Sequence, residues 1–169
     1  GLRQMNAPAL SEWVNSKGMA LNPVMGFSQR GFLGHAPSDG FQSLMQLLYV
    51  ALTEARVSED ARAHVFQQNK TFLEQIQKQD SYKGQQRIER ELLLSDPALV
   101  ALTTKELEDI SKDQMQSIYN RYFANAQQYR LAIVGDISEA DAKSVVLATI
   151  ANLPKNHPET KFRNLPAPT

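Results

Sequence analysis

The sequence predicts an α+β fold, in which a mixed or antiparallel sheet carries a layer of helices on one face. Apolar residues recur at helical spacing through most of the chain, and three short apolar runs are typical of strands. Two of these runs lie together in residues 19–34, whereas the third lies far along the chain at 131–134. Strands separated by a block of helices indicate segregated layers rather than an alternating α/β order.

The front of the chain predicts a short helix followed by a hairpin. The helix runs from Pro8 to Lys17, and Gly18 ends it because glycine adopts the left-handed C-terminal conformation without strain. Residues 19–24 and 27–34 then predict two strands joined by a tight turn. Pro23 favours an edge position for the first strand. Two glycines predict a bulge or a close backbone approach in the second, namely Gly31 and Gly34.

Three longer helices are expected in the middle of the chain. Ser38 is expected to cap the first, whose wide apolar face is Phe41, Leu44, Met45, Leu47, Leu48, Ala51 and Leu52. Ser58 is expected to cap the second, with the inward residues Ala61, Val65, Phe66, Phe72, Leu73 and Ile76. The third runs from Tyr82 to Leu94, and Asp96-Pro97 breaks it. The mixed charges on that helix predict a solvated face, made of Arg87, Glu89, Arg90 and Glu91.

The C-terminal third predicts two short helices, a buried strand and a last helix. Two capping boxes begin the short helices, Thr103 with Glu106 and Ser111 with Gln114. One face of the second helix carries Met115, Ile118, Tyr119, Tyr122 and Phe123, and the aromatic stripe within it, Tyr119, Tyr122 and Phe123, favours core packing. The continuous run Leu131–Val134 is typical of a strand covered on both faces, so we expect it to be central in the sheet that contains the hairpin. Ser138 is expected to cap the last helix, which buries Ala142, Val145, Val146, Thr149 and Ile150.

Domain organisation follows from these elements. Residues 1–154 are expected to form one domain, and the Pro-rich residues 155–169 a linker. Three strands make a thin sheet for so many helices, so at least one strand is expected before residue 1. Such a fragment would expose an unpaired strand edge and is expected to self-associate.

Composition excludes several kinds of protein. The net charge is zero, with 18 basic and 18 acidic residues, so no excess positive field exists to hold a nucleic acid. No apolar run approaches the roughly 20 residues that a membrane-spanning helix needs. The absence of cysteine excludes disulfides, thiol catalysis and thiolate metal sites.

Ordered motifs along residues 10–154 resemble those of one enzyme family. An aromatic helix end with Tyr119, Tyr122 and Phe123 precedes Val134-Gly135-Asp136, and a helix then ends in Leu153-Pro154. The Lys17-Gly18 hairpin and the Leu52-Thr53 helix end match further motifs, although Ala55 stands where a proline is usual. In this order the motifs resemble the insulinase/pitrilysin zinc metallopeptidases, which include the mitochondrial processing peptidases. The resemblance implies a metallopeptidase-like α/β sandwich domain whose first strands precede residue 1.

The resemblance also implies that the zinc lies outside this chain. The family holds zinc with an H-x-x-E-H helix and a downstream glutamate, but none of His35, His64 and His157 has a second histidine four residues away. The region that supplies the downstream glutamate reads Arg62-Ala63-His64-Val65 here. We therefore expect no catalytic, cofactor-binding or metal-binding residue. Asp136 follows the predicted strand and is expected to cap the turn into the last helix rather than act as a catalytic acid.

As a function, the resemblance implies a non-catalytic substrate-chamber domain of a zinc-dependent endopeptidase. The motifs fit best the first domain of the C-terminal half of a large bacterial zinc protease, with a periplasmic location and a cytoplasmic one as the alternative. Its partners would be the other domains of the same polypeptide and peptide substrates. The alternative function is an inactive scaffold or assembly domain, like the metal-free core subunits of the respiratory bc complex. An upstream H-x-x-E-H in the parent reading frame discriminates between them.

Overall fold

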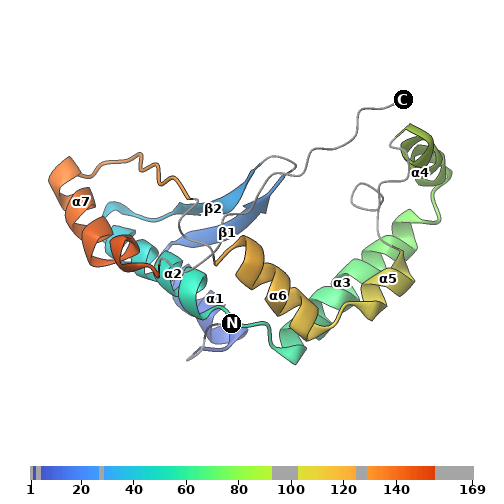
Figure 1. The fold of residues 1–169 in the computed structure, drawn as a ribbon, viewed down its shortest axis with the longest axis horizontal. Helices are drawn as coiled ribbons and strands as arrows, with labels where there is room; N and C mark the ends of the chain where they lie inside the picture. Colours follow the sequence, from blue (N-terminus) through green and yellow to red (C-terminus); the bar gives the residue numbers. More distant parts are fainter. Residues whose placement is uncertain (1, 3–4, 27–28, 93–102, 125–128, 155–169) are drawn as a thin grey trace. The chain divides into compact units, whose positions relative to one another are not determined.

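The computed structural model describes residues 2, 5–26, 29–92, 103–124 and 129–154, which form two compact units. Among the described residues, the first unit holds those up to Val57 and those from Gln116 to Pro154, and the second holds Ser58 to Met115. The elements in chain order (Figure 1) are α1 Ala7–Ser16, β1 Ala20–Met25, β2 Arg30–His35, a 3-10 turn Ser38–Gly40, α2 Phe41–Glu54, α3 Glu59–Ile76, α4 Asp80–Leu92, α5 Thr104–Asp109, α6 Lys112–Tyr122, α7 Glu139–Ala148 and a 3-10 turn Ile150–Asn152. The α+β class is confirmed. The boundary predicted at residue 154 stays a prediction.

In the first unit, α1 leads into the hairpin through a glycine C-cap. Gly18 has a φ of 61°, which a side chain would strain. The amide of Gly18 donates to the carbonyl of Asn15 at 3.0 Å, and the amide of Met19 donates to that of Val14 at 3.1 Å. This pair of bonds is a Schellman motif, and Met19, which follows Gly18, lies in the core. The predicted stop at Gly18 is confirmed.

The predicted hairpin is confirmed, with strands that begin and end slightly later than expected. β1 and β2 pair antiparallel in a continuous register from Ala20 opposite His35 to Met25 opposite Arg30. The amide of Gly26 donates to the carbonyl of Gln29 at 2.8 Å and closes the turn. The register contains no bulge. The close approach expected at a glycine occurs at Gly34.

Substituting Gly34 with alanine should destabilise the first unit. A Cβ there would lie 3.1 Å from the carbonyl oxygen of Ala20, 3.1 Å from Leu21 Cδ1 and 3.2 Å from Leu44 Cδ1. Relieving this overpacking should cost about 1–3 kcal/mol in the free energy of unfolding, measured by urea denaturation. The matched control is Gly84→Ala, where a Cβ meets nothing within 4 Å and the helix gains about 0.5–1 kcal/mol. A neutral Gly34→Ala would contradict the packing.

Helix α2 packs against both strands of the hairpin. Its predicted apolar face is confirmed, with Leu44, Met45, Leu47 and Leu52 buried. The core around Met19, Leu44 and Met45 is completed by half-buried residues of α1, the hairpin, α2, α7 and the 3-10 turn after α7, which include Trp13, Val14, Leu21, Leu48, Val145 and Ile150. The expectation that Ser38 caps this helix is wrong, because residues 38–40 form a 3-10 turn and place Gly40 before the helix.

The C-terminal end of α2 keeps a proline-like backbone without a proline. Ala55 has a φ of −61° and a ψ of 133°, which is the polyproline II conformation that proline favours. The side chain of Gln116 holds the residues around it, because its amide donates to the carbonyl of Ala55 at 3.1 Å and its oxygen accepts from the amide of Val57 at 2.8 Å. Ala55 therefore has a backbone conformation that a proline at this position could also adopt.

In the second unit, the predicted N-caps are confirmed. The hydroxyl of Ser58 accepts from the amide of Ala61 at 3.2 Å, and both capping boxes form, that of Thr103 with Glu106 and that of Ser111 with Gln114. The inward face expected for α3 is wrong in part, since Val65 and Phe72 are exposed. This helix contacts α5, and that short element is too small to cover the whole apolar stripe.

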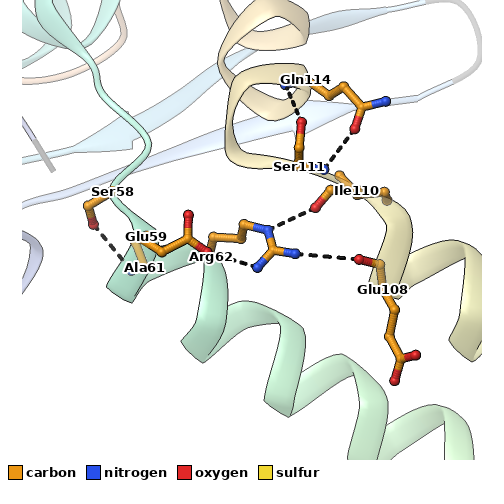
Figure 2. A network of polar contacts seen from close by, with 8 residues as sticks. All are labelled: Ser58, Glu59, Ala61, Arg62, Glu108, Ile110, Ser111 and Gln114. Atoms are coloured by element: carbon orange, nitrogen blue, oxygen red, sulfur yellow. Dashed lines mark hydrogen bonds and ion pairs between the residues drawn. The ribbon is translucent and has the colours of Figure 1, made fainter.

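Within the second unit, Arg62 connects α3 to the C-terminal end of α5 (Figure 2). From α3, its Nε donates to the carbonyl of Ile110 at 2.8 Å and its Nη2 to that of Glu108 at 3.4 Å, while Nη1 pairs with Glu59 at 2.9 Å. Ile110 follows directly after α5, so the guanidinium satisfies carbonyls that the helix itself leaves without donors. Lys70 adds an ion pair to Glu108 at 3.1 Å.

The solvated charged face predicted for α4 is confirmed for Arg87 and Glu91, while the side chains of Glu89 and Arg90 lie outside the described part of the chain. Arg87 and Glu91 are exposed and pair at 3.2 Å. The break at Asp96-Pro97 lies outside the described residues.

The expectation of a central strand at Leu131–Val134 is wrong in this chain. The described sheet has two strands, both from the hairpin, and residues 131–134 belong to neither. A strand needs hydrogen-bonding neighbours on its edges, and the described residues supply none to this run. The helix after it is confirmed, because Ser138 caps α7 by accepting from the amide of Asp141 at 3.1 Å, and Thr149 is buried.

Candidate functional site

Two of the three histidines lie in the described part of the chain, on different elements. His35 is the last residue of β2, and its side chain is exposed. His64 is exposed on α3, in the other unit. His157 lies outside the described residues. Among the residues that the structure describes, no three histidine, aspartate or glutamate side chains gather as a set of metal ligands.

The aromatic stripe at the end of α6 packs against Phe32 of β2. The ring of Phe123 lies edge-on to Phe32, with centroids 5.6 Å apart, and stacks on Tyr119 at 5.5 Å. The ring of Tyr129 lies 6.3 Å from that of Phe32. We call Phe32, Tyr119, Phe123 and Tyr129 the aromatic cluster. The expectation that this stripe packs in the core is confirmed for Phe123, which is buried, while Ile118 on the same helical face is exposed.

Polar groups at the rim of the aromatic cluster fix its geometry. The hydroxyl of Tyr119 donates to the carbonyl of Ala51 at 2.7 Å, and that of Tyr129 donates to the carbonyl of Phe123 at 3.1 Å. Arg30 Nε donates to the carbonyl of Tyr122 at 2.6 Å, and its guanidinium lies 5.6 Å from the centre of the Tyr122 ring. These bonds tie the end of α6 to α2 and to β2.

Burial keeps both cluster hydroxyls protonated. It raises the pKa of Tyr119 to about 12, and the neighbouring Tyr129 adds to the rise. Burial likewise raises the pKa of Tyr129, while the charge of Arg30 acts to lower it. Both hydroxyls therefore act as hydrogen-bond donors in the native state and not as acid–base groups near neutral pH.

The raised pKa of Tyr119 predicts a loss of stability in alkali. Its folded-state value of about 12 exceeds the ordinary 10.0, so the native chain holds the phenolic proton more tightly than the unfolded chain. The contribution is complete below pH 10 and is lost as the pH rises through about 12. Tyr119→Phe should cost about 1 kcal/mol at pH 8 through the lost hydrogen bond, and its deficit should shrink across that window. Urea midpoints measured from pH 8 to 12 check this, and a constant deficit would contradict it.

Tyr129 also positions the segment that follows it. A Cβ on Gly31 would lie 3.7 Å from the Tyr129 ring, so this ring lies against β2 where no side chain intervenes. Beyond it, apolar side chains face solvent: Leu131 is 44% exposed, Ile133 36% and Val134 100%. Asp136 is exposed in a bend after them, and the cap of α7 is Ser138.

A groove lies between this segment and α7. It has a volume of about 650 Å³ and is lined by Leu131, Ile133, Gly135, Ile137, Glu139, Ala142, Lys143 and Val146. We call it the α7 groove. The charged members Glu139 and Lys143 come from α7, and the segment contributes only apolar residues and glycine. Such a lining suits an apolar chain segment better than a charged metabolite. No sequence signal pointed to this groove, because it depends on the path of residues 131–137.

The described residues contain no helix long and apolar enough to cross a membrane.

Comparison with known proteins identifies the fold. No family model matches the sequence, and no curated protein sequence matches it either. Among solved structures, the chain is similar to the periplasmic protease PqqL from Escherichia coli, with a TM-score of 0.80 and 12% sequence identity. The match covers 100% of this chain and 18% of the PqqL chain. It supports the insulinase-type fold that the sequence motifs predict, and this chain spans less than a fifth of the length of the matched chain.

Proposed function

We propose that this chain is part of a non-catalytic domain that helps to enclose the substrate chamber of a zinc-dependent endopeptidase. The observation that carries the proposal is the match of the whole chain to part of a periplasmic protease. The ordered insulinase-type motifs support it independently, since they span residues 10–154 of the sequence. By the same reasoning we propose a periplasmic location, and we call the longer polypeptide the parent.

Catalysis in this proposal takes place elsewhere in the parent. Zinc held for peptide hydrolysis needs three protein ligands and a water, with two histidines close together on one helix in this family. The three histidines of this chain are too far apart in sequence for that arrangement, and the described residues offer no ligand set in space. This chain would contribute shape and apolar surface, while the zinc would be bound by a domain outside it.

Assaying the purified parent for cleavage of unstructured peptides tests the proposal. We expect cleavage that a zinc chelator abolishes and that added zinc restores, together with an H-x-x-E-H motif outside residues 1–169. Residues 1–169 alone should cleave nothing. A parent without that motif and without activity, found instead in a stable assembly, would contradict the proposal and favour the scaffold alternative.

A further inference from the structure

Two guanidinium groups lie against the ring of Tyr122 at the end of α6. The guanidinium of Arg30, from β2, and that of Arg121, from α6, each lie 5.6 Å from the centre of this ring. Arg30 is also held by the bond from its Nε to the carbonyl of Tyr122 at 2.6 Å. We call Arg30 and Arg121 the arginine pair. The fold thus brings two positive charges from distant parts of the sequence to one aromatic side chain.

The stretches of sequence that carry the arginine pair contain no acidic residue. Residues 13–38, which include the hairpin, and residues 116–135, which include most of α6, hold no aspartate and no glutamate, so all 18 acidic residues lie in the rest of the chain. The same two stretches hold the basic residues Lys17, Arg30, Arg121 and Arg130. Although the whole chain is neutral, this part of the first unit therefore has an excess of positive charge.

Arg121 is exposed, and it takes part in none of the ion pairs among the described residues. Its position in the last turn of α6 suits the negative end of the helix dipole. The dipole explains one positive charge at this helix end. It does not explain the second charge, which β2 supplies, or the lack of acidic residues in both stretches. A negatively charged ligand explains all three observations.

We propose that the arginine pair binds acidic side chains of the peptide substrates of the parent, an inference that rests on the proposed function. Arg121 would donate paired N–H groups to a carboxylate, and Arg30 would add its charge to the attraction. Because both guanidinium groups already pack against Tyr122, less side-chain freedom is lost on binding. A peptide is favoured over a nucleic acid because the chain has no net positive charge, and a phosphate backbone needs an extended basic surface.

Two peptides that differ only in carrying glutamate or glutamine at the same positions test the proposal with the parent. We expect kcat/KM to be at least about fivefold higher for the acidic peptide, mainly through a lower KM. Arg121→Gln should reduce this preference by about three- to fivefold, and Arg121→Lys, which keeps the charge, should reduce it less. Raising the ionic strength from about 0.1 M to about 1 M should weaken it, because salt screens exposed charges. Equal kcat/KM for the two peptides, or a preference that Arg121→Gln leaves intact, would overturn the proposal.

The matched control is Arg87→Gln, which removes the same charge from an exposed arginine of α4 and should leave the preference unchanged. Equal effects of Arg87→Gln and Arg121→Gln would overturn the proposal, because they would show an effect of net charge alone.

Binding of the two labelled peptides to the parent, with its zinc removed by a chelator, separates this inference from the proposed function. The acidic peptide should bind more tightly, and Arg121→Gln should remove the difference. That result in a parent that cleaves no peptide would refute only the proposed function. Chelator-sensitive cleavage with equal binding of both peptides would refute only this inference. Displacement of the acidic peptide by an equal concentration of inorganic phosphate would indicate a site for small anions, and would overturn the assignment to peptides.

Discussion

Replacing Phe123 with alanine is expected to lower the free energy of unfolding of the first unit by about 3–5 kcal/mol. The ring is buried and touches both Phe32 and Tyr119, so its removal forfeits apolar burial and leaves a cavity between β2 and the end of α6. Edge-to-face and stacked ring pairs add to the loss. The measurement is urea denaturation followed by tyrosine fluorescence and circular dichroism.

Ile118→Ala is the matched control for Phe123→Ala. It removes an apolar side chain from the same helix, but that side chain is 51% exposed, so the loss should stay below about 1 kcal/mol. Equal losses for the two variants would show that the aromatic cluster does not hold α6 to the hairpin.

Replacing Arg62 with alanine is expected to destabilise the second unit by about 1.5–3 kcal/mol. The variant leaves the carbonyls of Ile110 and Glu108 without their donor and removes the pair with Glu59. Arg62→Lys should recover little, because one ammonium lacks the fork that reaches both carbonyls. Hydrogen exchange of the amides in α3 and α5 reports the loss.

The control for Arg62 is Arg87→Ala on α4. Arg87 also pairs with a glutamate, but both side chains are largely exposed, and such pairs contribute less than about 1 kcal/mol. A second unit that tolerates Arg62→Ala as well as Arg87→Ala would contradict the role of the guanidinium.

Local sequence signals predicted the starts of the helices well, because an N-cap hydrogen bond joins residues that are only three positions apart. Ser58, Thr103, Ser111 and Ser138 all cap as expected. Ser38 does not, because a 3-10 turn takes up residues 38–40 before α2 begins.

Contacts between residues far apart in the sequence could not be predicted from these local signals. The run Leu131–Val134 has the composition of a strand, but composition does not supply a partner, and the described chain provides none. The prediction that Val65 and Phe72 on α3 are buried was wrong for the same reason. A periodic pattern indicates an apolar helix face but does not indicate which element covers it. The α7 groove could not be predicted at all, since it forms where a segment and a helix meet in space.

Zinc stoichiometry of the parent tests the central claim most directly. The claim is that residues 1–169 belong to a zinc endopeptidase but bind none of its zinc. The parent should hold one zinc per chain, and it should hold the same amount after the double substitution His35→Ala and His64→Ala, with peptide cleavage unchanged. Residues 1–169, stripped with a chelator and reloaded, should retain no stoichiometric zinc. Loss of zinc and of cleavage in the double variant, or one tightly held zinc in residues 1–169, would contradict the account.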